Sequence, residues 1–498
     1  MDTASPYPSF TYMMPFAYIL ILLASALTGC ASAPTAPADL PQAPTTFKEG
    51  DGLWMAAPPA EAQPRGMWWK VFSDPALDDL VERAGRSNTT IQLAAARLSQ
   101  AQALVRAAEA NRWPIAGLNA GVSRQGGVLI NPAGDQGTLI STSVNLGYEL
   151  DLFGRISQAA RAATLDAASR EALLRSAQLL VQADVAQTYL ALRAVDTERA
   201  LVRGTLEAYG DTLRLTESRF EKGLVAELDV VRARADVAST ESELRALDGR
   251  RASLEHALAV LVGEVPSTFA VAEREWTTAL PIIPAGVPST VLTRRPDVSA
   301  AQRSMQAAQA RVGLAKTAWF PAISLTASGG YASPQLSDLF SIAARSWAIG
   351  ALLALPLFDG GRREAGVQNA AAELEASVAS YREQILVAFR DVEDQLSALR
   401  LLAQQAAAQS RAVTASERAT VLSASRYRSG LASQLDLLDA QRTELRNRRQ
   451  ALQVRSAQYQ ATVGLVRALG GAWDTPAPRT PTASRCVSCE SHAGAPAS

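Results

Sequence analysis

The residue types that carry most enzyme and metal chemistry are scarce in this sequence. Among its 498 residues only His256 and His492 are histidines, and the three cysteines are Cys30, Cys486 and Cys489. The last two form a CxxC pair in a Pro/Ala/Ser-rich tail, where one pair supplies too few ligands for a closed zinc site. The sequence contains no nucleophile–base constellation, phosphate-binding loop or metal-ligand cluster, so we expect no enzyme activity, cofactor or metal.

The charge balance excludes a second group of functions. Lys and Arg together number 48, Asp and Glu also number 48, and the formal net charge is zero. No basic field is therefore available to attract nucleic acid, and we expect no nucleic-acid partner. The length exceeds what one compact core requires, which predicts several domains or one elongated body.

Cys30 differs from the other cysteines because it follows a short apolar segment. The run from Phe16 to Leu27 is too short to span a bilayer and ends in Leu-Thr-Gly-Cys. This arrangement resembles a bacterial lipoprotein signal, which is cut before a cysteine that is then acylated. No Lys or Arg precedes Cys30, so a mis-assigned start codon or a short buried helix with a chance cysteine stays open. Ala31, rather than Asp, favours release to the outer membrane in this resemblance.

Most of the remaining chain consists of two similar copies of one unit, offset by about 207 positions, which indicates an internal duplication. Matching positions include Trp113 with Phe320, Gly223 with Gly430, and Gly263 with Gly470. The predicted domains are a signal peptide over 1–29, a Pro/Ala-rich linker over 30–66, a first structural repeat over 67–270, a second over 271–474, and a disordered tail over 475–498.

Each copy changes to a two-residue period in its middle, which predicts two β-strands per copy. The alternation covers approximately residues 115–123, 141–149, 323–331 and 347–355. The polar positions hold Ser, Thr, Asn and Gly, whereas a soluble sandwich usually carries charged side chains there. Tyr148, Tyr331 and Trp347 add the aromatic content of transmembrane strands around a wet interior.

Four such strands cannot close a barrel by themselves. An open edge in lipid would leave backbone groups unpaired at a cost on the order of several kcal/mol each. Other copies of the chain must therefore complete the barrel. Two copies would give eight strands with a filled interior, and three would give twelve strands with room for a lumen.

Long helices occupy the rest of each copy. No convincing breaker occurs between Arg155 and Gly223, which predicts a helix of about 67 residues, or roughly 100 Å. The opening helix, Ser87–Arg112, and the return helix, Ala226–Val262, together have about the same length. We therefore expect each copy to form one long helix that packs beside two shorter helices stacked end to end. Heptad spacing over residues 374–399 predicts coiled-coil-like packing.

Several motifs together resemble one known family. They are Leu-Thr-Arg-Arg-Pro-Asp at 292–297, the turn at 357–362, the segment 430–442 and the closing Ala-Leu-Gly-Gly-Ala-Trp at 468–473. In this order they resemble the TolC-like outer membrane factors, in the lipoprotein (NodT-type) branch of resistance-nodulation-division efflux systems, over about residues 65–474. The resemblance implies a mixed α/β membrane protein with internal duplication. Four transmembrane strands per chain would complete a trimeric twelve-stranded barrel, continued by a long α-helical barrel.

The same resemblance implies a role and partners. The chain would be the outer-membrane channel of a tripartite efflux pump, a passive conduit for small molecules that works with a periplasmic adaptor and an inner-membrane pump. The adaptor would dock at two helix tips, Lys222, Gly223 and Leu224 in the first repeat and Ser429, Gly430 and Leu431 in the second.

The periplasmic gate would be formed by Leu435, Asp439 and Arg442. Their spacing places these side chains on one helical face. A ring of leucines would block wetting, while the acid and the arginine could pair between neighbouring chains. Two alternative functions stay open at this point: the exit duct of a type I protein-secretion system, and a structural coiled-coil lipoprotein without a pore.

Overall fold

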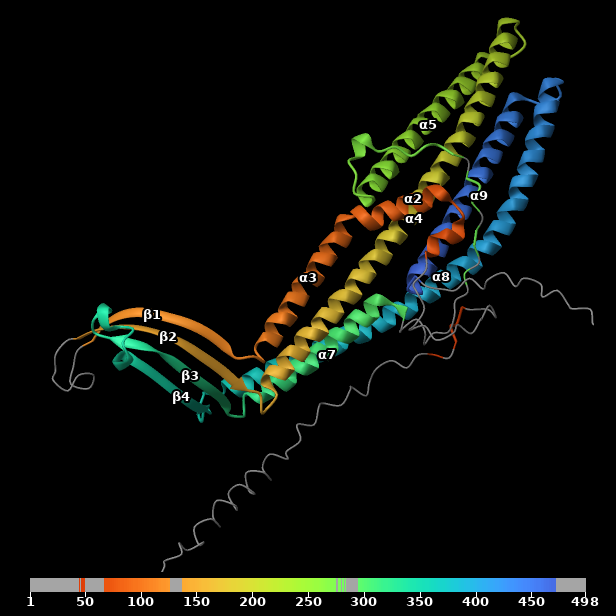
Figure 1. Cartoon of the computed structure of the whole chain (residues 1–498). Helices are drawn as coiled ribbons and strands as arrows, with labels where there is room; N and C mark the ends of the chain where they lie inside the picture. Colours follow the sequence, from red (N-terminus) through yellow and green to blue (C-terminus); the bar gives the residue numbers. More distant parts are fainter. Residues whose placement is uncertain are drawn as a thin grey trace, which may run out of the picture. The chain divides into compact units, whose positions relative to one another are not determined.

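The computed structural model describes residues 44, 46–49, 67–125, 137–274, 276–278, 280–281, 283 and 294–471. The predicted signal peptide, Cys30, most of the linker and the tail with Cys486 and Cys489 lie outside these residues. The described residues divide into two compact units, of which the first lies within Ala108–Ala162 and Met305–Val378. The second lies within Pro41–Ala107, Ala163–Ser304 and Ala379–Ser498. Figure 1 shows the described elements of both.

The first unit contains a four-stranded antiparallel sheet in the order β1-β2-β3-β4. The strands are β1 Ile115–Gln125, β2 Gly137–Leu150, β3 Ala322–Ser333 and β4 Arg345–Ala354. The two central strands come from different repeats and pair Val144 with Gly329 and Tyr148 with Leu325. Within the described residues, β1 and β4 each pair with one neighbour, so the sheet has two open edges.

Aspartates cap the long helices that follow the strands. Asp151 accepts hydrogen bonds from the Ile156 and Ser157 amides at 2.9 and 2.8 Å, which satisfies donors at the start of α4. Asp359 accepts from the Gly361 and Arg363 amides, both at 3.1 Å, before and in the first turn of α8. These caps define where strand periodicity gives way to helix.

The helices repeat in length as well as in order. The long helices α4, Arg155–Glu221, and α8, Arg362–Arg428, each have 67 residues. The return helices α5, Glu227–Leu261, and α9, Gln434–Ala468, each have 35. The opening helices α3, Thr89–Ala110, and α7, Pro296–Thr317, each have 22. The predicted duplication and the predicted 67-residue helix are confirmed.

Two short elements precede α3 that the sequence did not predict. They are the 3-10 helix η3, Trp68–Phe72, and the helix α2, Pro75–Ser87. Asp74 caps α2 and also accepts a hydrogen bond from the buried Tyr189 hydroxyl at 2.7 Å. This bond holds the start of α2 to α4, and Trp68 of η3 donates from its indole nitrogen to the Gln182 side chain of α4 at 3.1 Å. Among the described residues, no helix is long and apolar enough to cross a membrane.

The shorter helices of the first repeat meet end to end. The Asn88 side-chain amide donates to the Leu261 carbonyl at 2.8 Å, near the end of α5. Its side-chain oxygen accepts from the Thr90 and Ile91 amides at 2.9 and 3.2 Å, at the start of α3. One residue therefore satisfies orphan groups at two helix ends, and the predicted stacking of the shorter helices is present.

A glycine makes this close approach possible in each repeat. Gly263 has φ 75°, and a Cβ there would lie 2.5 Å from the Ser87 carbonyl oxygen. Gly470 has φ 88°, and a Cβ there would lie 2.8 Å from the Arg294 carbonyl oxygen. Both positions combine left-handed backbone with a neighbouring main chain that has little room to move.

We predict that Gly263→Ala lowers the free energy of unfolding by about 2 kcal/mol or more, because strain from the left-handed backbone adds to a backbone collision. Thermal unfolding of the purified protein, followed by its helical circular dichroism, measures the effect. Gly204→Ala is the matched control, because Gly204 lies inside α4 with no atom within 4 Å of a new Cβ. It should stabilise by about 0.5–1 kcal/mol. Equal melting of the two variants would contradict the proposed end-to-end contact.

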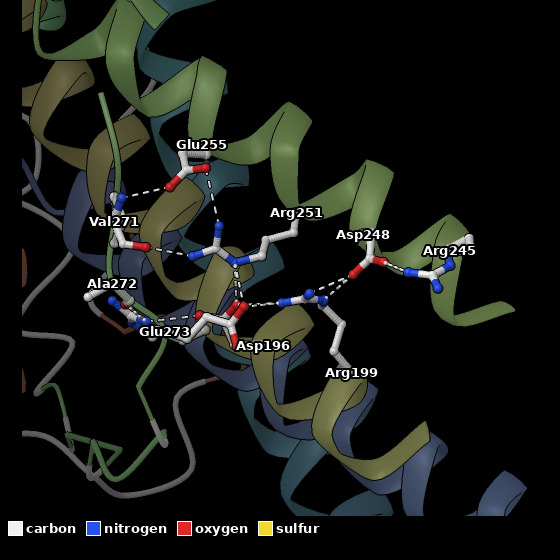
Figure 2. Close-up of polar contacts among 10 residues, drawn as sticks. Asp196, Arg199, Arg245, Asp248, Arg251, Glu255, Val271, Ala272 and Glu273 are labelled. Atoms are coloured by element: carbon white, nitrogen blue, oxygen red, sulfur yellow. Dashed lines mark hydrogen bonds and ion pairs between the residues drawn. The ribbon is translucent and has the colours of Figure 1, made fainter. Parts of the chain in front are cut away.

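A buried ion network joins α4, α5 and the segment that follows α5, whose described residues include Val271–Arg274 and Trp276–Thr278 (Figure 2). We call it the connecting segment. Asp196 of α4 accepts from Arg193 at 2.9 Å and from Arg251 of α5 at 2.8 Å. The Arg193 and Asp196 side chains are 2% and 4% exposed. Arg251 also donates to the Val271 carbonyl at 2.6 Å, and Arg193 donates to the Ala272 carbonyl at 2.8 Å. The connecting segment is therefore fixed onto the first helical hairpin.

The connecting segment continues onto the second repeat. Arg455 of α9 donates to the Trp276 and Thr278 carbonyls, both at 3.2 Å, and its guanidinium lies 4.6 Å from the centre of the Trp276 ring. The buried Tyr459 ring packs against Trp276 at 4.7 Å. The segment thus binds both hairpins of the second unit.

Candidate functional site

The predicted docking tips are the two turns that join each long helix to its return helix. Gly223 and Gly430 have φ 71° and 74°, the left-handed conformation that ends a helix. The Leu224 amide donates to the Arg219 carbonyl at 2.9 Å, and the matching Leu431 amide donates to Arg426 at 2.8 Å. All six predicted tip residues are exposed in the single chain: Lys222, Gly223, Leu224, Ser429, Gly430 and Leu431. The two leucines expose 69% and 71% of their surface.

The helix that carries the predicted gate begins directly after the second tip. Ser433 and Asp436 form a capping box, in which the Ser433 hydroxyl accepts from the Asp436 amide at 3.2 Å and Asp436 accepts from the Ser433 amide at 3.1 Å. The hydrogen bond from the Ser433 side chain lowers the pKa of Asp436 below its ordinary value. Leu437 and Leu438 are buried, and Leu437 lies on the side of α9 away from the predicted gate residues.

All three predicted gate residues are exposed in the single chain. Leu435 is 54% exposed, and the Arg442 side chain is 49% exposed. Asp439 is also exposed, and its carboxylate makes no hydrogen bond or ion pair within the described part of the chain. The three predicted gate residues therefore lie on one helix, and Asp439 and Arg442 do not form an ion pair with each other within the described chain.

Arg442 has a partner that the sequence did not suggest. Its guanidinium pairs with Asp236 of α5, in the hairpin of the other repeat. The Asp236 side chain is only 11% exposed. The hydrogen bond to Asp236 raises the pKa of Arg442, although burial acts in the opposite direction. The α9 helix is therefore held by a partly desolvated pair inside its own chain.

Further contacts join the two hairpins near their tips. The Tyr427 ring of α8 lies 4.5 Å from the Arg219 guanidinium of α4, and its hydroxyl lies 3.3 Å from the Thr216 hydroxyl. Gln434 donates to the Asp229 carbonyl at 3.2 Å, which connects α9 with α5. Each helix of one hairpin therefore contacts a helix of the other.

Tyr209 marks a loosely packed region behind these contacts. Its side chain is 3% exposed, and its hydroxyl has no hydrogen-bond partner among the described residues. Burial, followed by the negative charge of Asp236, raises the pKa of Tyr209 to about 12. Open cavities of about 370 and 440 Å³ lie beside Tyr209 in the single chain.

Ion pairs and hydrogen bonds connect the helices in this region. Within the described residues, no group of three or more His, Cys, Asp or Glu side chains is arranged to hold a metal ion. The arrangement can hold helices together or release them, which is what a gate requires.

Comparison with known proteins identifies the fold. The model of the outer membrane efflux protein family matches residues 80–264 and again residues 287–471. The chain is 34% identical over 408 residues to the solvent efflux pump outer membrane protein SrpC of Pseudomonas putida, covering 81% of this chain and 87% of that protein.

Solved structures agree with the sequence relatives. The outer-membrane channel OprN superposes with a TM-score of 0.81 at 30% identity, over 88% of this chain and 99% of OprN. The outer membrane protein VceC of Vibrio cholerae gives a TM-score of 0.77 at 30% identity, over 82% of this chain and 99% of VceC. The predicted fold class, outer-membrane location and efflux role are confirmed. The chain belongs to the outer membrane efflux protein family and is the outer-membrane channel component of an efflux system.

Proposed function

We propose that three copies of the chain form a passive conduit for small molecules, without catalytic chemistry. The observation that carries this proposal is the four-stranded sheet, whose outer strands β1 and β4 have open edges within the described residues. In a hydrocarbon environment such edges must be paired, and sister chains can supply the pairing strands. Twelve strands then surround a lumen, which the helices extend into the periplasm.

The cargo can be tested by deleting the gene. The deletion strain should become more sensitive to small toxic compounds such as solvents or antibiotics, while its profile of secreted proteins stays the same. Loss of particular secreted proteins with unchanged sensitivity would favour the protein-secretion duct instead.

The proposed gate is the ring of Leu435, Asp439 and Arg442 from the copies in the assembly. Their exposure on α9 leaves them available to the lumen or to a neighbouring chain. Leucine side chains would exclude water at the narrowest point, and charge pairs that release under tension would make closure reversible. Asp236 pairs with Arg442 in this chain, and in the proposed gate this pair would separate on opening.

The proposed adaptor-docking surface is the pair of tips. Their exposed leucines, Leu224 and Leu431, occupy matching positions in the two repeats and offer a periplasmic adaptor two similar apolar contacts. The adaptor would connect the channel to an inner-membrane pump. Changing both leucines to Asp should abolish resistance while leaving the assembly intact, because a charge on each apolar contact opposes docking. Sensitivity assays and co-purification measure this, and resistance at the wild-type level would contradict the assignment.

The proposed membrane anchor is acylated Cys30. Cys30→Ser should remove incorporation of radioactive palmitate, because no sulfur would remain at the acceptor position. Cys486→Ser is the matched control and should be labelled like the wild type. Continued labelling of the Cys30 variant would overturn the anchor.

A further inference from the structure

Two ion pairs join the return helices of the two repeats, and they lie one heptad apart. The outer pair is Asp236 of α5 with Arg442 of α9. The inner pair is Glu243 with Arg449, each seven positions further along its helix. Seven residues make about two helical turns, so both pairs lie on the same face of each helix.

The inner pair is more extensively bonded than the outer one. Arg449 also contacts Glu198 of α4, through Nη2 at 2.7 Å and Nε at 2.8 Å. The Glu198 side chain is 8% exposed and Arg449 is 28% exposed, compared with 49% for Arg442. Burial alone lowers the pKa of Arg449, but its contacts with Glu198 and Glu243 outweigh this and raise it. Water and salt therefore screen the contact between Arg449 and Glu198 less than the outer pair, although Glu243, at 34% exposed, is more exposed than Asp236, at 11%.

Two open cavities flank the two pairs in the single chain. A cavity of about 440 Å³ is lined by all four charged side chains of the two pairs. A second cavity of about 370 Å³ lies against α4, where the lining residues include Ala200, Gly204 and Ala208. From this stretch of α9, Leu445 packs against the apolar cluster of Val202, Leu244 and Leu247. The ion pairs therefore contribute much of what fixes α9 against α5 between the cavities.

We propose that Arg449, with Glu243 and Glu198, is a second lock of the gate that positions α9 in its closed register. The inference rests on the proposed gate. Breaking the outer pair frees the tip of α9, while the inner pair still holds the helix one heptad further in. Full opening then requires both pairs to separate.

The test compares single-channel recordings of variants in planar lipid bilayers. Arg442→Ala alone should raise the open probability, and Arg449→Ala alone should change it by no more than about twofold, because the outer lock still closes the pore. The double variant should exceed Arg442→Ala by about tenfold. Arg448→Ala is the matched control added to Arg442→Ala, since Arg448 pairs with Glu417 and Glu444 at 2.9 and 2.8 Å inside a single hairpin. This control should not increase opening further.

Two additional variants separate positioning from folding. In the Arg442→Ala background, Arg449→Lys keeps the positive charge and should return the open probability toward that of Arg442→Ala alone. Glu243→Gln changes a side chain that is 34% exposed and removes the same ion pair. If Arg449→Ala prevents assembly, Glu243→Gln takes its place, and in the Arg442→Ala background it should increase opening. If Arg442→Ala opens the channel and neither inner variant adds to it, the second lock is wrong and the proposed gate stands. If Arg442→Ala leaves the channel closed, the proposed gate itself is wrong.

Discussion

Replacing Asp196 by Ala should destabilise the protein by about 3–5 kcal/mol, the usual cost of removing one partner from a buried ion pair. Asp196 accepts from Arg193 at 2.9 Å. It also accepts from Arg251 at 2.8 Å (Figure 2). Without Asp196, the buried Arg193 and the neighbouring Arg251 would both lose the carboxylate that they share. The connecting segment at Val271 would lose part of its support, because Arg251 also holds that carbonyl.

Chemical or thermal unfolding of the purified protein measures this effect. The matched control is Asp211→Ala on the same helix, because Asp211 pairs with Arg214 and their side chains are 70% and 74% exposed. An exposed pair of this kind contributes about 0–1 kcal/mol. If the two variants unfold alike, the network is not a stabilising element of the hairpin.

Arg442→Glu should make cells permeable to bulky antibiotics that normally cannot enter. The substitution replaces an attraction to Asp236 with a repulsion and places a second acid near Asp439 on the same helix. For a half-exposed residue the change is about 1–2 kcal/mol, enough to shift the ratio of open to closed channels about tenfold. Vancomycin sensitivity and single-channel conductance report the shift.

Two variants test the physical reason for this leak. Asp236→Ala removes the partner of Arg442 and should act in the same direction. Arg448→Glu changes an arginine nearby on α9 whose partners lie within one hairpin, and it should leak much less. Equal leak from Arg448→Glu and Arg442→Glu would indicate general loosening of the helices rather than a gate.

The sequence predicted the elements that depend on local periodicity. Strand alternation, the uninterrupted stretch from Arg155 to Gly223 and the repeated glycines are local signals, and duplication presents each of them twice. The structure confirms the four strands and both 67-residue helices. It also shows α4 continuing through Gly204 and Gly210, because packing along a long helix outweighs the low helix propensity of glycine.

The partners of the charged residues could not be predicted in the same way. The sequence suggested that Arg442 could pair with an acid of a neighbouring chain, which stays a prediction; it did not suggest the pair with Asp236 inside the chain. Such pairing depends on how two distant helices align, which the pattern of either helix alone does not specify. One signal was available, because the acids at 236 and 243 and the arginines at 442 and 449 share a seven-residue spacing on matching helices.

Conductance in a planar lipid bilayer tests most directly whether sheets from three chains close around a water-filled lumen. Purified wild-type protein should insert as a trimer and give small or brief currents, and Arg442→Glu should give larger and longer ones. A membrane that stays silent with both proteins, although each has inserted, would contradict the existence of the pore.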